Sequence, residues 1–137
     1  MNKILVIGSN SFAGSDFIDF LLTKKVKVFG VSRKEEARKE YLRYKENKNL
    51  KKFKFYKINL NLKKDLNKLI QIIKKEKIQY IVNFAAQGMV AESWINPEDW
   101  YLTNVVSHSI LIKKLLKLKI KKYLNFSTPE VYGHTPS

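Results

Sequence analysis

The stretch "KILVIGSNSFAGSDFIDFLLTK", residues 3–24, decides the fold of this chain. Its first part, residues 3–9, is a short apolar run rich in Ile and Val that ends in Gly and Ser, which is typical of a buried parallel strand. The second part, residues 13–24, places apolar side chains at helical spacing, namely Phe17, Ile18, Leu21 and Leu22. A strand, a glycine-containing turn and a helix in this order predict the start of a β-α-β unit.

The rest of the chain repeats this alternation. Further strands are predicted at residues 25–32, 51–60, 79–86 and 121–128, and helices at residues 65–75 and 97–119. The highly charged residues 33–47 form either a helix or a mobile insertion. The order predicts an α/β fold, a Rossmann-like doubly wound parallel sheet of about five strands with right-handed crossovers. We expect one domain over residues 1–137.

Composition bounds the class of protein. The chain has 137 residues and is 45% hydrophobic, enough for one domain with a packed core. It contains no cysteine, which removes disulfide and thiolate chemistry and fits a cytoplasmic protein. No apolar stretch has the length of a membrane span, so we expect no membrane partner. We predict no metal site.

The net charge of +15 raises the possibility of a nucleic-acid binder. Of the 27 basic residues, however, 24 are Lys, and they are scattered over several predicted elements instead of gathering beside aromatic residues. A solvated basic surface explains this pattern better, so we predict no nucleic-acid partner. A salt titration of DNA binding separates the two interpretations.

The turn "GSNSFAG", residues 8–14, is the first candidate site. Glycines here let the backbone approach a pyrophosphate, and the N-terminus of the following helix offers free N–H groups. The strict G-x-G-x-x-G template fails because position 10 is Asn, whereas a looser G-x-x-G-x-x-G spacing fits. An ordinary strand–helix turn is the alternative. The candidate cofactor-binding residues are Gly8, Asn10, Ser11, Phe12, Ala13 and Gly14.

The end of the second strand bears on the choice of cofactor. Sites for NAD usually carry an acid here that holds the ribose 2′-hydroxyl, and Arg accommodates a 2′-phosphate instead. This chain has Ser32, Arg33 and Lys34, with no acid before Glu35. NADP is therefore slightly favoured over NAD, with Ser32 and Arg33 as candidate contacts. The alternative is that the basic pair only begins a solvated helix.

Two later strands also end in candidate residues. The segment "NFAAQ", residues 83–87, has small side chains that allow a ligand close to the backbone, although tight strand–helix packing explains them equally well. After the fifth strand, the Thr128 hydroxyl can bind a substrate oxygen and Glu130 can act as a general base. The alternative for Glu130 is an ordinary surface acid.

Together these segments resemble the extended short-chain dehydrogenase/reductase family, the NAD(P)-dependent nucleotide-sugar epimerases and dehydratases. "GSNSFAG", "NFAAQ", "VAESWINPEDWYLTNVV" and "STPEVYG" are similar to four of its motifs, in the same order. The resemblance implies a nucleotide-sugar substrate that is transiently oxidised at C4 of its hexose, with Thr128 binding the C4 hydroxyl and Glu130 removing the proton from the neighbouring carbon. It adds further cofactor contacts, which are Asn59, Leu60, Phe84, Ala85, Ala86 and Asn104.

Two departures from the family pattern matter. Pro129 stands where dTDP-glucose 4,6-dehydratases have Asp, and this with the basic end of the second strand favours similarity to GDP-mannose 4,6-dehydratases. The family's catalytic Tyr-x-x-x-Lys lies beyond the fifth strand, and the string at Tyr41–Lys45 lies before the third strand, so we interpret it as coincidence. The resemblance implies the cofactor-binding front part of a longer, homodimeric enzyme, inactive without its substrate domain. The alternative is a non-catalytic dinucleotide-binding module.

Overall fold

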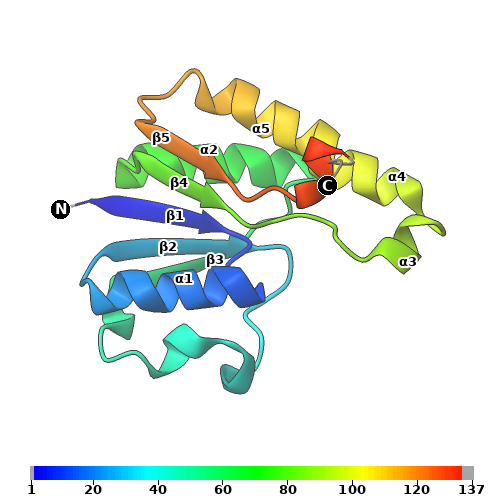
Figure 1. Ribbon diagram of the computed structural model, residues 1–137. Coiled ribbons are helices and arrows are strands. Elements are labelled where there is room, and N and C mark those ends of the chain that lie inside the picture. The colour runs from blue at the N-terminus through cyan, green and yellow to red at the C-terminus, as the bar shows by residue number, and fades with distance from the viewer. Residues whose placement is uncertain (1, 134–137) are drawn as a thin grey trace.

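A computed structural model of the chain describes residues 2–133, and it contains one parallel sheet with the strand order β3-β2-β1-β4-β5. The strand arrowheads point to the same end of the molecule (Figure 1). The strands are β1 Lys3–Ile7, β2 Lys27–Ser32, β3 Phe53–Lys57, β4 Tyr80–Asn83 and β5 Lys122–Asn125. The predicted Rossmann-like fold is thereby confirmed.

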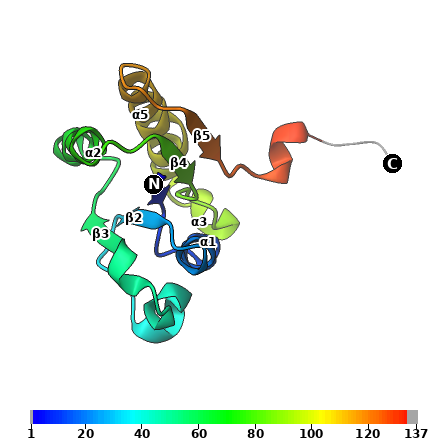
Figure 2. The same cartoon turned by 90° about the vertical axis from the view of Figure 1, so that its left-hand side faces the viewer.

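Helices cover both faces of the sheet. Helix α1 (Phe12–Thr23) lies on one face, and helices α2 (Lys63–Glu76) and α5 (His108–Leu115) lie on the other (Figure 2). The alternation along β1 explains the two layers, because Leu5 and Ile7 are buried in the core beneath α2 and α5, whereas Val6 is buried in the core beneath α1. No helix within residues 2–133 has both the length and the apolarity that crossing a membrane requires.

The prediction of a helix over residues 33–47 is wrong. The segment forms two short 3₁₀ turns, η1 (Lys39–Tyr41) and η2 (Arg43–Glu46), and a third turn, η3 (Leu50–Lys52), precedes β3. Leu42 and Tyr44 are fully buried in the core beneath α1, while Tyr41 is 73% exposed. A burial period of two residues cannot come from an α-helix, and the packed side chains argue against a mobile insertion.

The predicted long helix over residues 97–119 is a continuous helical segment, but its middle part is a π-helix instead of an α-helix. It begins with α4 (Pro97–Trp100), as the proline at its first turn predicts, passes through a π-helix, η4 (Tyr101–Ser107), and ends with α5 at Leu115. A short helix, α3 (Val90–Ser93), precedes it and was not predicted. The last element within residues 2–133 is the 3₁₀ turn η5 (Pro129–Tyr132).

All five strands are shorter than predicted, and β1, β3, β4 and β5 end earlier than predicted at the carboxyl edge of the sheet. β1 ends at Ile7, since Gly8 turns into the left-handed region with a φ of 82°. β4 ends at Asn83, whose side-chain oxygen accepts a hydrogen bond from the Ala85 N–H. β5 ends at Asn125.

Candidate functional site

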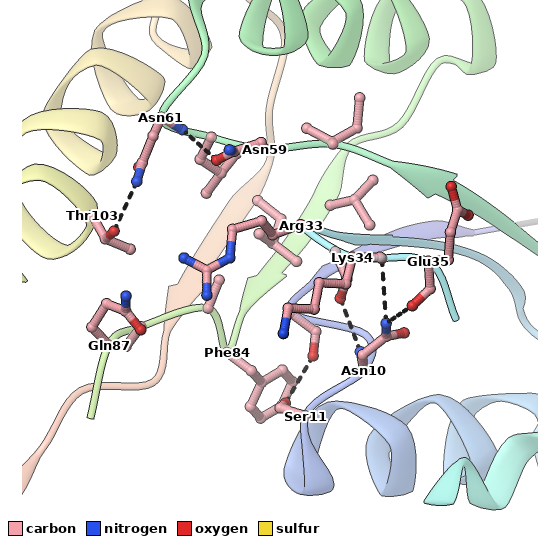
Figure 3. A pocket seen from close by; sticks show the side chains of 18 of the residues that line it. Asn10, Ser11, Arg33, Lys34, Glu35, Asn59, Asn61, Phe84, Gln87 and Thr103 are labelled. Carbon is pink, nitrogen blue, oxygen red and sulfur yellow. Dashed lines mark hydrogen bonds between the residues drawn. The ribbon is translucent and has the colours of Figure 1, made fainter. Parts of the chain in front are cut away.

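A cavity of about 500 Å³ lies at the carboxyl ends of β1 to β4. The loop after β1 forms its floor, the segment after β2 forms one wall, and the loops after β3 and β4 form the others (Figure 3). The connections from β1 and β4 leave the sheet in opposite directions here, because β1 lies between β2 and β4. Open α/β sheets bind ligands at such a topological switch point.

The loop after β1 closes tightly against the loop after β4. A Cβ atom at Gly8 would lie 2.7 Å from the Ala85 backbone nitrogen and 2.8 Å from the Phe84 carbonyl carbon, and φ at Gly8 is positive. A Cβ at Gly14 would overlap the Gly8 carbonyl oxygen. Both glycines are therefore required by the close approach of backbone to backbone.

Ser11 fixes the start of helix α1. Its hydroxyl donates to the Gly8 carbonyl oxygen at 2.8 Å and accepts from the Gly14 N–H at 3.0 Å. This is an N-cap, and it replaces the middle glycine of the looser motif with a side chain that satisfies one of the free N–H groups of the helix. The remaining N–H groups of the first turn leave this end of α1 positive.

The segment after β2 brings positive charge to the cavity. Arg33 and Lys34 both line it, and their side chains extend into it in Figure 3. Ser32, at the end of the strand, accepts a hydrogen bond from the Asn10 N–H at 3.0 Å and lies 3.3 Å from the Ser9 hydroxyl. The hydroxyl at the usual position of an acid is therefore engaged with the glycine loop.

The loop after β3 is held by side chains from two helices. The Asn59 N–H donates to Asp65 in α2 at 2.8 Å, and the Asn61 side chain donates to the Thr103 hydroxyl at 3.0 Å. The Ser107 hydroxyl in turn donates to the Asn61 oxygen at 2.8 Å. The π-helix therefore contributes Thr103 to the cavity wall, and Asn61 fixes its side chain there.

Ten of the fourteen predicted cofactor-binding residues line this cavity. They are Gly8, Asn10, Ser11, Ser32, Arg33, Asn59, Leu60, Phe84, Ala85 and Ala86. Phe12, Ala13, Gly14 and Asn104 do not line it: Phe12 is 85% exposed on α1, and Asn104 acts one step away, on the backbone of Gln87.

Thr128, one of the two predicted catalytic residues, does not line this cavity. Thr128 lies in a separate, open depression of about 430 Å³ after β5, together with Ser127 and Tyr132. Glu130 belongs to the turn η5, but its side chain lies outside the described part of the structure. Tyr41 is exposed, and the Lys45 ammonium pairs with Glu36 at 2.7 Å, so neither end of the Tyr-x-x-x-Lys string reaches the cavity.

Sequence reasoning missed several lining residues. Three of them, Ile7, Val31 and Ile58, lie at the end of a strand or just after it, so correct strand boundaries would have identified them. Lys34 and Glu35 directly follow the predicted Arg33. Gln87 ends the candidate segment at residues 83–87, whereas Ala37, Asn61 and Thr103 carry no local signal, because tertiary packing brings them to the cavity.

A second polar pair lies beneath β5, away from the cavity. The Tyr123 hydroxyl and His108 Nε2 are 2.9 Å apart. Burial raises the pKa of Tyr123 to about 12, and burial lowers the pKa of His108. The pair therefore stays neutral near neutral pH and joins α5 to the edge strand.

The parallel sheet, the glycine turn and the cavity at the switch point define a Rossmann-like nucleotide-binding fold. The family model described as GDP-mannose 4,6 dehydratase matches residues 5–137, and the chain belongs to this family. This assignment to the family rests on a match over nearly the whole sequence.

Relatives in this group differ in their named activities. The chain is 33% identical over 138 residues to a dTDP-D-glucose 4,6-dehydratase of Dictyostelium discoideum, covering 97% of this chain and 30% of the relative. It is 36% identical over 62 residues to a UDP-glucose 4-epimerase of Halalkalibacterium halodurans, covering 45% of this chain and 19% of the relative. The chain therefore spans less than half the length of these relatives.

Solved structures agree with this assignment. The UDP-glucose 4-epimerase of Bifidobacterium longum, in complex with NAD⁺ and UDP, is 26% identical with a TM-score of 0.81, over 96% of this chain and 38% of that one. The UDP-glucose 4-epimerase of Thermotoga maritima, with UDP-glucose, is 28% identical with a TM-score of 0.79, over 98% of this chain and 41% of that one.

Proposed function

We propose that this chain is the cofactor-binding part of an NAD(P)-dependent nucleotide-sugar 4,6-dehydratase or epimerase. The observation that carries the proposal is the tight glycine turn at Gly8, opening into a cavity of about 500 Å³ in a chain of this family. When bound, the nicotinamide would accept hydride from C4 of a nucleotide-linked hexose and return it. The residues present fit a dinucleotide, because a Cβ at Gly8 would close the space between the two loops that line the cavity.

Each part of the cavity suits one part of the dinucleotide. The turn from Gly8 to Ser11 presents backbone at the positive end of α1, which suits a pyrophosphate. Arg33, at the end of β2, suits the adenosine ribose or its phosphate. Asn59 and Leu60 suit the adenine, whose edge needs hydrogen-bonding partners and whose faces need apolar contact.

We favour NADP over NAD as the cofactor. Ser32 stands where an acid would hold the ribose 2′-hydroxyl, and its oxygen already accepts from the Asn10 N–H. Arg33 and Lys34 then supply positive charge for a 2′-phosphate. The B. longum epimerase structure holds NAD⁺, so the preference rests on this chain's own residues.

The sugar chemistry rests on the loop after β5. Thr128 would bind the C4 hydroxyl, and Glu130 would act as the base in a dehydratase. The Tyr and Lys that complete the family's hydride chemistry, the sugar-binding part and the contacts of a homodimer would belong to a longer protein. The chain alone would then bind cofactor without turning substrate over.

Titration of the chain with NADP⁺ and NAD⁺, followed by calorimetry, tests this proposal. Gly8→Ala should lower the affinity for either dinucleotide by roughly tenfold or more, since the added methyl group meets backbone atoms. Gly88→Ala is the matched control, because a Cβ there meets no atom within 4 Å. Far-UV circular dichroism shows whether both variants fold. A wild-type chain that binds neither dinucleotide would refute the proposal.

A further inference from the structure

Asn10 stands where the strict G-x-G-x-x-G motif has its second glycine. The backbone conformation at position 10 does not require a glycine in this chain. Within residues 2–133, positive φ values occur at Lys25, Lys77, Gly8 and Gly133, so Asn10 has a conformation that any residue adopts. A glycine is thus not needed at position 10 for the turn. The Asn10 side chain, however, makes contacts that a glycine could not make.

Asn10 joins the glycine loop to the segment after β2. Its backbone N–H donates to the Ser32 hydroxyl at 3.0 Å, and its Nδ2 donates to the Glu35 carbonyl at 2.7 Å and more weakly to the Lys34 carbonyl at 3.4 Å (Figure 3). These bonds span about two dozen residues of sequence. One side chain therefore fixes the backbone that immediately follows Arg33.

Within the described residues, the backbone of residues 33–37 makes no hydrogen bond besides those to the Asn10 side chain. Residues 33–38 lie between β2 and η1, outside helix and strand. The acids of this segment are engaged elsewhere, Glu35 with Lys57 at 3.2 Å and Glu36 with Lys45 at 2.7 Å. Within the described residues, Arg33 and Lys34 form no salt bridge and line the cavity. Arg33 and Lys34 therefore line the cavity together with one carboxylate, Glu35, which is paired with Lys57.

We propose that Asn10 is a positioning residue that sets the preference for a 2′-phosphorylated nucleotide. It holds the Lys34–Glu35 backbone so that Arg33 and Lys34 meet one phosphate without first paying the entropy of ordering the segment. This inference rests on the proposed function, because it assumes that the cavity takes the adenosine end of a dinucleotide. The chemical group it recognises is a phosphate monoester on the ribose.

The test compares two probes that differ only in that phosphate, 5′-AMP and adenosine 2′,5′-bisphosphate. The wild-type chain should bind the bisphosphate roughly tenfold more tightly, as one charge-assisted phosphate contact predicts. Asn10→Ala and Asn10→Gly should bring this ratio close to one, because they lower the affinity for the bisphosphate more than the affinity for 5′-AMP. Asn10→Gln, which keeps an amide donor, should retain more of the ratio than Asn10→Ala.

Asn47→Ala is the matched control. The Asn47 amide also donates twice, to the Asp19 carbonyl at 3.2 Å and the Asp19 carboxylate at 2.7 Å, but Asn47 does not line the cavity. Its loss should lower stability and leave the ratio unchanged. Hydrogen exchange of residues 33–37 should quicken in Asn10→Ala and Asn10→Gly but not in Asn47→Ala.

The outcomes separate the two proposals. A wild-type chain that binds neither probe refutes the dinucleotide site and this inference with it. Two results would overturn the role of Asn10 and leave the dinucleotide site intact. One is a wild-type chain that binds both probes equally. The other is a set of Asn10 variants that bind 5′-AMP and keep the wild-type ratio. A reduced ratio in Asn47→Ala as well would also overturn it, because any loss of loop order would then suffice.

Discussion

The side chain of Asn104 clamps the backbone of Gln87 at both of its polar groups. Its Oδ1 accepts from the Gln87 N–H at 2.8 Å, and its Nδ2 donates to the Gln87 carbonyl at 3.0 Å. Asn104 belongs to the π-helix η4, and Gln87 follows the small residues after β4 that line the cavity. The widened helix therefore holds the cavity wall from behind.

Asn104→Ala should weaken dinucleotide binding roughly five- to tenfold, since it frees the backbone at Gln87, and should cost about 1–2 kcal/mol of folding free energy. Calorimetric titration and urea unfolding measure the two effects. Val105→Ala, at the next and 57% exposed position, is the control and should change neither by much. An Asn104→Ala protein with lower stability but unchanged affinity would show that the clamp is only structural.

The packing of residues 33–47 makes a second prediction. Leu42 is fully buried, so Leu42→Ala should destabilise the chain by about 2–5 kcal/mol, as for other large-to-small core substitutions. Tyr44→Phe, which removes the 2.8 Å bond to Glu36, should cost about 1–2 kcal/mol. Tyr41→Ala, at a position 73% exposed, should be nearly neutral. Equal, small effects at all three positions in urea unfolding would mean that the segment is not packed.

The His108–Tyr123 pair makes stability depend on pH. Burial lowers the pKa of His108 in the folded chain below 6.5, so the unfolded chain binds more protons as the pH falls through this range. The contribution of neutral His108 to the free energy of unfolding is fully present above a pH of 6.5. It is lost as the pH falls through the pKa that His108 has in the folded chain. His108→Gln should therefore flatten the dependence of Tm on pH between about 5 and 7. The difference between wild type and variant isolates this histidine, and parallel curves would exclude its titration.

Local patterns were enough to predict the sheet and the parts of the cavity that follow β1, β2 and β4, whereas Asn59 and Leu60, after β3, came from the resemblance to the family. Ile and Val runs mark the strands, and ligand-facing residues of a parallel sheet follow strand ends, so Gly8, Arg33 and Ala85 were found from their place in the sequence. Those predictions needed only the alternation of strand and helix.

Contacts between distant residues could not be predicted in this way. Thr103 reaches the cavity from a π-helix and is held by Asn61, 42 residues earlier, and neither residue stands out in the sequence. Leu42 and Tyr44 lie in a stretch whose charge favours a solvated helix, and burial against α1 overrides that propensity. The Asn10 contact with the Lys34–Glu35 backbone likewise appears only when the two loops meet.

The sheet formed within residues 2–133 is uncovered near β5, and we expect this surface to promote self-association. Within the described residues, β5 pairs only with β4 and forms an edge of the sheet. The Phe126 ring stacks on Phe84 with centroids 4.3 Å apart, and Phe84 meets Phe17 of α1 at 5.6 Å. Phe126 is 54% exposed and Leu124 is 41% exposed, so an apolar surface borders a strand edge with unpaired backbone groups.

We expect the chain to associate with itself as its concentration rises, and Phe126→Lys to shift sedimentation velocity profiles towards the monomer. The charge would oppose burial of this surface, and a lysine beside an edge strand also opposes edge-to-edge pairing. Tyr41→Lys places the same charge at another exposed aromatic position, in η1, and should leave the association unchanged. A wild-type chain that stays monomeric at high concentration would contradict an interaction through this surface. Equal effects of the two lysine substitutions would contradict it too, because overall charge repulsion alone would then explain them.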